Sequence, residues 1–344
     1  MRKALLLGVA VALAFTGSAF AQETQSGTIA GQVLDPQGAA VPGATVTVIS
    51  PQGDKTYTTD SEGRFIAPFL IPGMYDVRVD LTGFKTIEQK GIMVRLGQRS
   101  RLTFTLAVSQ VQETVEVVGA SPVIDLSSTT AGGVMDSDML KQLPVGRNFT
   151  QTLYLVPGVS DSSGVGNANP SISGASGLEN SYVVDGVNIA STGFGGVGVY
   201  TIVYGSLGTG VTTDFISETQ VKTAGFEAEY GQATGGVVNV VTKSGTNQFH
   251  GSLFGYWSPD ALEGSWNDLQ TPNGTVNTTQ TNTADFGLTA GGPIIKDKLV
   301  AFGAFNPQYQ TRTFIAPDDV ENFPLRSLGD VDRKRNIYSY AAKV

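Results

Sequence analysis

The residues whose spacing most resembles a chemical site are six glycine-rich positions. Gly193-Phe194-Gly195-Gly196-Val197-Gly198 satisfies the G-x-G-x-x-G spacing of a dinucleotide-binding loop, and Glu218 follows about 20 residues later, as such a loop requires. The loop must open a helix, because the N-terminus of that helix holds the pyrophosphate. Residues 199–204 are β-branched and aromatic, which favours a strand. The sequence therefore predicts no nucleotide site here.

The sequence also contains little that would predict a hydrolytic site or a metal site. His250 is the only histidine, and neither G-x-S-x-G nor G-x-x-x-x-G-K-[ST] occurs, so a Ser-His-Asp arrangement would depend on His250 alone. Asp60 and Glu62 could be cation ligands, but carboxylates in a D-x-E-G turn usually bond their own backbone. We assign no catalytic residue, no cofactor and no metal, and we expect the chain not to be an enzyme.

The composition favours strands and turns as the elements that position these residues. Only 15% of the residues are charged, and the chain contains 43 glycines and 15 prolines. Abundant Val, Thr, Ser and Asn favour many short strands, so we predict a mainly β fold. The net charge of −8 argues against a nucleic-acid partner. The absence of Cys excludes disulfides and thiolate metal sites.

The first 21 residues have the pattern of a signal peptide. Arg2 and Lys3 precede an apolar run at 4–15, and Ala19-Phe20-Ala21 fits the small-x-small cleavage pattern, so cleavage is predicted between Ala21 and Gln22. The run is well short of the roughly 20 residues that span a bilayer as a helix. Since no later segment is a candidate either, a membrane would have to be crossed by β-strands.

Residues 22–109 are predicted to form a small β-sandwich. Period-two runs alternate with Gly/Pro/Asp turns, and about seven strands are expected in about 80 residues. The runs include Thr28–Leu34, Ala44–Ile49, Arg64–Ala67, Tyr75–Leu81 and Arg101–Leu106. Four ordered motif pieces, among them Thr59-Asp60-x-x-Gly63-x-Phe65 and Leu70-x-Pro72-Gly73-x-Tyr75-x-Val77, resemble the carboxypeptidase regulatory-like domain. The resemblance implies a transthyretin-like or carbohydrate-binding-like sandwich that acts as an accessory module without peptidase activity.

Residues 110–120 contain a short extended apolar stretch. An unpaired strand of this kind can donate its backbone hydrogen bonds to the sheet edge of a partner, although a terminal strand of the sandwich would look similar. The stretch resembles a TonB box, which implies an energy-coupling role for Glu113, Thr114, Val115, Glu116, Val117 and Val118.

Residues 121–244 are predicted to form an α+β domain. Asp136 offers a helix N-cap before Pro144, a second helix is expected over 150–156, and strands are expected at Tyr182–Val184, Glu218–Thr223 and Gly236–Thr242. Motifs such as Leu143-Pro144-x-x-Arg147-Asn148-Phe149 and Val183-Val184-Asp185-Gly186-Val187 resemble the plug domain of TonB-dependent receptors.

The segment Ala224–Gly251 is similar to the plug-to-barrel junction of the Oar-like subgroup of these receptors, in which a carboxypeptidase regulatory-like domain precedes the plug. A tight bend is expected at Gly235 and Gly236 before the last plug strand. A polar turn that contains Lys243 and Gly245 is then expected to lead into the first strand of a barrel wall.

Residues 245–344 are predicted to begin a transmembrane β-barrel. Alternating segments lie at Phe249–Ser258, Thr283–Gly292, Lys298–Asn306 and Asn336–Val344, with a hairpin turn at 296–298 and a long loop at 259–282. Six aromatic residues are candidates for an interfacial girdle, namely Phe254, Tyr256, Trp257, Phe286, Phe302 and Phe305. An ordinary soluble sandwich is the alternative. Four strands fall short of the about 22 of plugged transporters, so we expect a truncated N-terminal fragment.

The resemblance implies a receptor in the outer membrane of a Gram-negative-type bacterium, with its N-terminal domain in the periplasm. The implied partners are a TonB-type periplasmic energy-coupling protein, outer-membrane lipid and a substrate that could be glycan, peptide, siderophore or protein. Import, export and oligomeric state stay open. The alternative is a secreted module that binds carbohydrate or another surface ligand and carries a vestigial plug.

Overall fold

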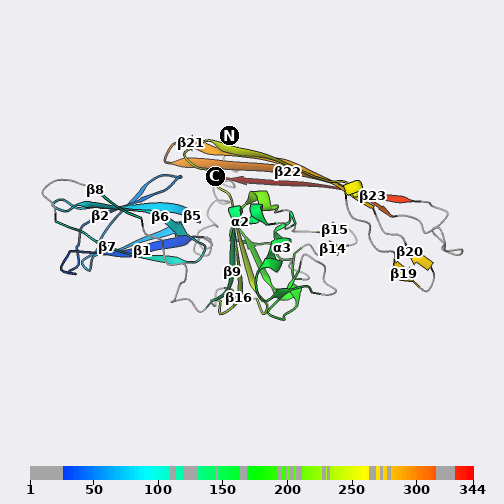
Figure 1. The fold of residues 1–344 in the computed structure, drawn as a ribbon, viewed down its shortest axis with the longest axis horizontal. Helices are drawn as coiled ribbons and strands as arrows, with labels where there is room; N and C mark the ends of the chain where they lie inside the picture. Colours follow the sequence, from blue (N-terminus) through cyan, green and yellow to red (C-terminus); the bar gives the residue numbers. More distant parts are fainter. Residues whose placement is uncertain are drawn as a thin grey trace, which may run out of the picture. The chain divides into compact units, whose positions relative to one another are not determined.

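A computed structural model describes the chain in two compact units. One unit is Met1–Thr209 with Ile216–Lys243, and the other is Gly210–Phe215 with Ser244–Val344 (Figure 1). The described residues are 26–108, 114–118, 130–143, 146–162, 169–191, 195–197, 200–201, 205–206, 211–226, 230, 233–262, 269–271, 274–276, 280–314 and 330–344. The predicted signal peptide, with Ala21 and Gln22, and Glu113 of the box-like segment lie outside them.

The N-terminal part is a β-sandwich, which confirms the predicted fold (blue to cyan in Figure 1). One sheet has the strand order β4-β1-β7 and the other β3-β2-β5-β6-β8. Its strands are β1 (Gly27–Leu34), β2 (Thr45–Ile49), β3 (Lys55–Thr58), β4 (Arg64–Leu70), β5 (Gly73–Asp80), β6 (Thr86–Val94), β7 (Arg99–Thr105) and β8 (Thr114–Val118).

Alternating side chains build the core between the two sheets. In β5, Tyr75, Val77 and Val79 are buried while the residues between them are not, which is the period of a strand with one face covered. Eighteen buried residues between Ile29 and Leu106 form one continuous cluster. The sandwich therefore has a hydrophobic core of its own, as an independent domain requires.

The plug part is an α+β domain around a five-stranded sheet of order β13-β12-β17-β16-β9 (green in Figure 1). The sheet strands are β9 (Ala131–Asp136), β12 (Ser181–Val184), β13 (Val187–Asn188), β16 (Ile216–Ala224) and β17 (Val237–Thr242). Two short two-stranded sheets join β10 (Val159–Ser160) to β11 (Ser171–Ile172) and β14 (Tyr200–Thr201) to β15 (Gly205–Ser206).

Both predicted helices are present and begin at side-chain caps. Helix α2 (Ser137–Gln142) is capped by Asp136, whose side chain accepts hydrogen bonds from the N–H groups of Asp138 and Met139. Helix α3 (Phe149–Thr152) is capped by Asn148 and continues into the 3-10 turn η2 (Leu153–Leu155). Two further 3-10 turns are η3 (Gly177–Glu179) and η4 (Thr213–Phe215).

The second unit contains a four-stranded antiparallel sheet of order β18-β21-β22-β23 (yellow to red in Figure 1). Its strands are β18 (His250–Ser258), β21 (Gln280–Ile295), β22 (Leu299–Phe314) and β23 (Val331–Lys343). The predicted hairpin turn between β21 and β22 is confirmed. The predicted long loop at 259–282 is wrong in part, because it holds the 3-10 turn η6 (Asp260–Leu262) and a hairpin of β19 (Leu269–Thr271) and β20 (Gly274–Val276).

Candidate functional site

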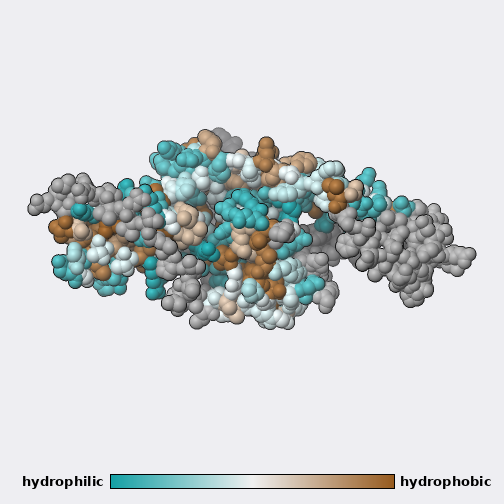
Figure 2. Space-filling model, in the orientation of Figure 1, coloured by the Kyte–Doolittle hydropathy of each residue, from teal (hydrophilic) through white to brown (hydrophobic). Residues whose placement is uncertain are grey.

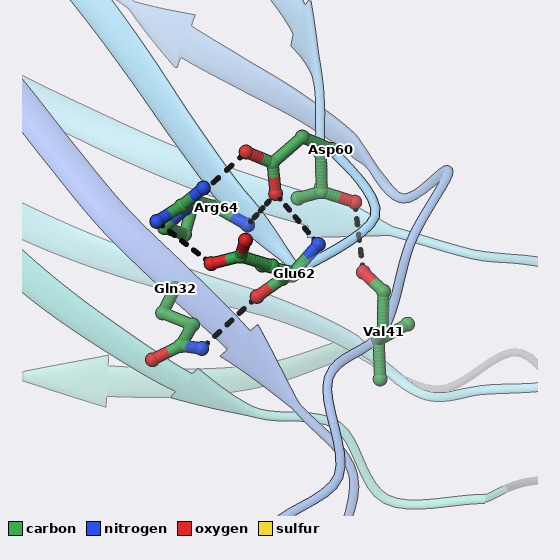
Figure 3. A network of polar contacts seen from close by, with 6 residues as sticks. Gln32, Val41, Asp60, Glu62 and Arg64 are labelled. Carbon is green, nitrogen blue, oxygen red and sulfur yellow. Dashed lines mark hydrogen bonds and ion pairs between the residues drawn. The ribbon is translucent and has the colours of Figure 1, made fainter.

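The acidic turn of the sandwich is held together by its own backbone and one arginine (Figure 3). Asp60 Oδ1 accepts hydrogen bonds from the N–H groups of Glu62 at 2.9 Å and Arg64 at 2.8 Å. The Arg64 guanidinium lies 3.3 Å from Asp60 Oδ2 and 2.7 Å from Glu62 Oε2. The hydrogen bond from the Arg64 backbone N–H is the main cause that lowers the pKa of Asp60. These carboxylates have the partners expected of a self-bonded turn, as the sequence predicted.

The described part of the glycine-rich string forms a tight turn around a buried asparagine. The Asn169 amide pairs with the Val197 backbone: its Oδ1 accepts from the N–H at 2.6 Å and its Nδ2 donates to the carbonyl at 2.8 Å. Gly195 and Gly196 have φ values of 71° and 64°, and a Cβ at Gly195 would lie 2.3 Å from the Leu178 carbonyl oxygen. Backbone geometry therefore accounts for both glycines without a phosphate.

His250 is an exposed residue at the first position of β18. Its Nδ1 lies 3.2 Å from Thr246 Oγ1 and 3.1 Å from the Gln248 carbonyl oxygen. Both neighbours belong to the turn that leads into the strand. His250 therefore helps to hold that turn. Neither of these two contacts is a carboxylate, which a catalytic histidine would need as its partner.

The described residues contain neither grouped metal ligands nor a membrane-spanning helix. No three His, Cys, Asp or Glu side chains there are grouped so that they could hold a metal ion. None of the helices described is both long and apolar enough to span a bilayer.

The box-like segment is an edge strand of the sandwich. Its described part, β8, pairs in parallel with β6 from Thr86↔Thr114 to Lys90↔Val118. It is the last strand of the five-stranded sheet, with β3 at the other edge. Strand β8 thus has one sheet edge paired with β6, and Glu113 lies outside the described residues.

The two junction glycines of the plug allow close packing. Residues 234–235 form a bend, yet neither Gly235 nor Gly236 has a positive φ. A Cβ on Gly236 would lie 2.4 Å from Ile172 Cγ2, and one on Gly235 would lie 2.3 Å from Asn180 Oδ1. The expected bend is present, but the glycines are needed because neighbouring side chains approach the backbone, and not because of a left-handed conformation.

The turn after β17 begins the second unit. Lys243 is the last residue of the first unit, and a Cβ on Gly245 would lie 2.4 Å from the Ala301 carbonyl oxygen of β22. Asn247 and Asp297 bond reciprocally, because Asn247 Nδ2 donates to Asp297 Oδ1 at 2.7 Å and Asn247 Oδ1 accepts from the Asp297 N–H at 2.8 Å. The polar turn is thereby fixed to the β21–β22 hairpin.

The four-stranded sheet has one apolar and one polar face, as alternation along each strand requires. Brown, hydrophobic residues are visible on this sheet in Figure 2. The exposed apolar face carries Leu253, Trp257, Phe286, Leu288, Phe305, Tyr309, Tyr338 and Tyr340. The opposite face carries buried polar residues, namely Asp285, Thr289, Asn306 and Ser339. A transmembrane barrel strand has this pattern, with apolar side chains toward lipid and polar side chains toward the lumen.

Three of the six aromatic residues predicted for the girdle lie on the other face. Phe302 is buried and packs with Phe215 and Phe254, and Tyr256 shares the face of Phe254 because the two residues are separated by one position in β18. Trp257, Phe286 and Phe305 lie on the exposed apolar face. The prediction is therefore wrong for Phe254, Tyr256 and Phe302, because it counted aromatic residues without assigning each to a face.

The sequence did not identify the contact that joins the sandwich to the plug. Leu96, in the turn between β6 and β7, donates its N–H to Glu218 Oε1 at 2.8 Å, and its carbonyl oxygen accepts from Gln220 Nε2 at 2.9 Å. Leu96 is completely buried, and Glu218 is 3% exposed. Burial raises the pKa of Glu218 to about 7, although the Leu96 hydrogen bond and the charge of Arg95 act in the opposite direction.

Comparison with known proteins gives the same order of domains. The carboxypeptidase regulatory-like domain family matches residues 28–107, the TonB-dependent receptor plug domain family matches 125–237, and an outer membrane beta barrel domain family matches 241–321. The TonB-dependent transporter Oar of Myxococcus xanthus is 38% identical over 328 residues, which cover 90% of this chain and 29% of that transporter. The chain therefore spans less than a third of this relative.

Solved structures with some similarity include two outer-membrane proteins. The outer membrane transporter YddB from Escherichia coli is 15% identical with a TM-score of 0.47, over 64% of this chain and 32% of that chain. The siderophore receptor PirA from Acinetobacter baumannii is 24% identical with a TM-score of 0.37, over 62% of this chain and 29% of that chain.

Proposed function

We propose that this chain, which belongs to the TonB-dependent receptor family and carries a carboxypeptidase regulatory-like domain before its plug, is the gating and coupling part of a substrate transporter. The plug and barrel domains assign it to the outer membrane of a Gram-negative-type bacterium. In this proposal the sandwich lies in the periplasm, the plug closes the barrel, and the protein catalyses no reaction. Glycan, peptide, siderophore and protein stay candidate substrates.

The observation that carries the proposal is the position of strand β8. It is the last strand of the sandwich in the chain and lies at a sheet edge. It precedes β9, the first strand of the plug sheet in the chain. The outer edge of such a strand can pair its backbone groups with the sheet of a partner. We propose that a TonB-type energy-coupling protein takes Glu113–Val118 as an added strand and pulls on it.

Site-directed cross-linking tests this function directly, because the chain contains no cysteine. In the full receptor, Val115→Cys should form a disulfide with a cysteine in the C-terminal domain of the TonB-type protein. Thr56→Cys is the matched control, since Thr56 lies in β3 at the opposite edge of the same sheet. We expect at least tenfold more cross-link at position 115 than at position 56. Equal yields at both positions would exclude β8 as the coupling segment.

A further inference from the structure

The turn between β6 and β7 bonds one residue to side chains of the plug sheet. Residues 95–98 form this turn, in which the Gln98 N–H donates to the Arg95 carbonyl oxygen at 3.2 Å and Gly97 has a φ of 61°. Leu96, at its tip, has no exposed surface. A residue at the tip of a turn between two strands is usually exposed, so its burial indicates a docking contact.

The contact satisfies both polar backbone groups of one residue with two side chains of β16. Glu218 Oε1 accepts from the Leu96 N–H, and Gln220 Nε2 donates to the Leu96 carbonyl oxygen, at 2.8 and 2.9 Å. Glu218 and Gln220 are two positions apart, so they project from the same face of the strand. We call this set of Leu96, Glu218 and Gln220 the Leu96 clip.

The clip holds a carboxyl group out of water. Glu218 is 3% exposed and Gln220 is 8% exposed. The charged groups that act on the carboxyl are Arg95 on the turn and Asp136 opposite it on β9. Lys222, farther along β16, has its Nζ near Gly97 of the turn. Because an unpaired buried polar group is costly, removing the turn would leave Glu218 without its Leu96 donor.

The clip lies on a continuous path from the box-like segment to the centre of the plug. Strand β8 pairs with β6, β6 ends two residues before Leu96, and Leu96 bonds β16. Strand β16 in turn pairs with β17 on one side and β9 on the other. Force applied to β8 through its pairing with β6 would therefore reach β16 across the clip.

We propose that the Leu96 clip is a mechanical connection through which the sandwich transmits a pull on β8 to strand β16 of the plug. The proposal deepens the proposed function, since it rests on that function for the source of the pull. The contact itself exists without any pull. The two ideas can therefore be tested by separate measurements.

Hydrogen–deuterium exchange of the Leu96 amide in the full receptor tests the contact. We expect exchange at least tenfold slower than the intrinsic rate, because the N–H is bonded and buried. Glu218→Ala should accelerate exchange at least tenfold, whereas Glu218→Gln, which retains an acceptor oxygen, should preserve most of the protection. Glu62→Gln, in the acidic turn of the sandwich, is the matched control. An unprotected Leu96 amide, or equal exchange in the Ala and Gln variants, would overturn the clip.

Labelling of a buried position in β16 tests the transmission. Thr219 is fully buried, so the thiol introduced by Thr219→Cys should react with a maleimide only when the plug sheet opens. In energised cells we expect labelling to fall at least fivefold when Glu218→Ala or Gln220→Ala is added, while the cross-link through Val115→Cys persists. Unchanged labelling would overturn transmission through the clip. Loss of the Val115 cross-link in the parent receptor, with a protected Leu96 amide, would instead refute the coupling function and leave the clip as a static contact.

Discussion

At the scale of single residues, the plug depends on buried amides that bond distant backbone. Asn169 is 1% exposed and pairs with both polar groups of Val197, 28 positions away. Asn180 donates to the Pro170 carbonyl oxygen and accepts from the Gly236 N–H. The backbone groups that these amides bond, at Pro170, Val197 and Gly236, lie outside the strands. Such groups can be buried only if they find partners of this kind.

Replacing Asn169 should open the glycine turn. Asn169→Ala leaves the Val197 N–H and carbonyl unpaired in a buried site, so we expect a loss of about 2–4 kcal/mol in local stability. Hydrogen exchange of peptides that contain 195–197 measures this loss. Asn188→Ala is the control, because Asn188 is exposed and accepts only one local bond there, from the Ala190 N–H. Equal exchange in the two variants would contradict the assigned role of Asn169.

Residue-level prediction from sequence succeeded where the partners are local. The Asp60–Arg64 turn was predicted because its hydrogen bonds join residues two and four apart. The Leu96 clip joins positions 122 and 124 apart, and no local pattern connects Glu218 or Gln220 with Leu96. The glycines at 235 and 236 were identified, but their physical reason was not, since it depends on Ile172 and Asn180.

At the scale of elements, alternation predicted the strands whose pattern is regular. Strand β6 was not singled out because the polar run Glu88-Gln89-Lys90 precedes Gly91, which has a φ of 73°. Strand β3 was missed because it is short and mostly exposed. Strands β21 and β22 extend beyond their predicted ends because polar Thr, Asn and Gln residues continue the pairing. The backbone hydrogen bonds between strands do not require apolar side chains. The strands are therefore longer than the stretch of alternating apolar residues.

The two faces of β18 should respond differently to the same charge. Leu253 is 87% exposed on the apolar face, and its neighbour Ser252 lies on the face of Thr289, to which its hydroxyl bonds at 2.7 Å. Leu253→Arg would place a cation toward lipid, at a cost of about 2–4 kcal/mol near the bilayer midplane. We expect less full receptor to assemble in the outer membrane, measured by heat-modifiable mobility on gels. Ser252→Arg should assemble nearly normally, and equal defects would contradict the assignment of faces.

Fixing β8 to β6 should leave capture of the coupling protein intact, because a partner sheet can pair with the other edge of β8. Gln89 and Val117 are direct partners in the parallel register, so Gln89→Cys with Val117→Cys can be joined by a short bifunctional reagent. We expect the joined receptor to copurify with the TonB-type protein as well as the unjoined receptor does. The matched control joins Thr47→Cys to Thr56→Cys, which are partners in β2 and β3 at the other edge. At least tenfold less copurification with the receptor joined between β6 and β8 would show that β8 must leave its sheet, and would contradict a pull through its pairing with β6.

At the scale of the whole chain, the order of domains was readable because each domain has its own pattern. Short turns mark the sandwich, capped helices between strands mark the plug, and long alternating strands mark the barrel. The contact between sandwich and plug was not readable. It depends on a turn whose sequence, Arg95-Leu96-Gly97-Gln98, contains no signal beyond its glycine. Burial of Glu218 at that contact should nevertheless make the first unit sensitive to pH.

The stability of the first unit should fall as the pH rises from about 5 to 8. The pKa of Glu218 is raised from 4.5 to about 7 by burial, so the folded state binds a proton that the unfolded state releases in this interval. The stabilising effect of that proton is fully present below pH 4.5 and is lost as the pH passes through 7. The difference in pKa corresponds to about 3 kcal/mol at most. Asp60 acts in the opposite direction, because its pKa is lowered, but its effect is confined to more acidic solutions.

Urea titrations of the full receptor at pH 5, 6, 7 and 8 measure this dependence, with hydrogen exchange in β16 and β17 as the readout. The midpoint should decrease steadily in the parent protein and stay constant in Glu218→Gln, whose side chain cannot ionise. The difference between the two proteins isolates the contribution of Glu218, because every other titrating group is common to both. A parent midpoint that does not change with pH, or one that changes equally in Glu218→Gln, would mean that Glu218 ionises in the folded receptor as it does in water. The Leu96 hydrogen bond and the charge of Arg95 would then offset the effect of burial on the pKa of Glu218.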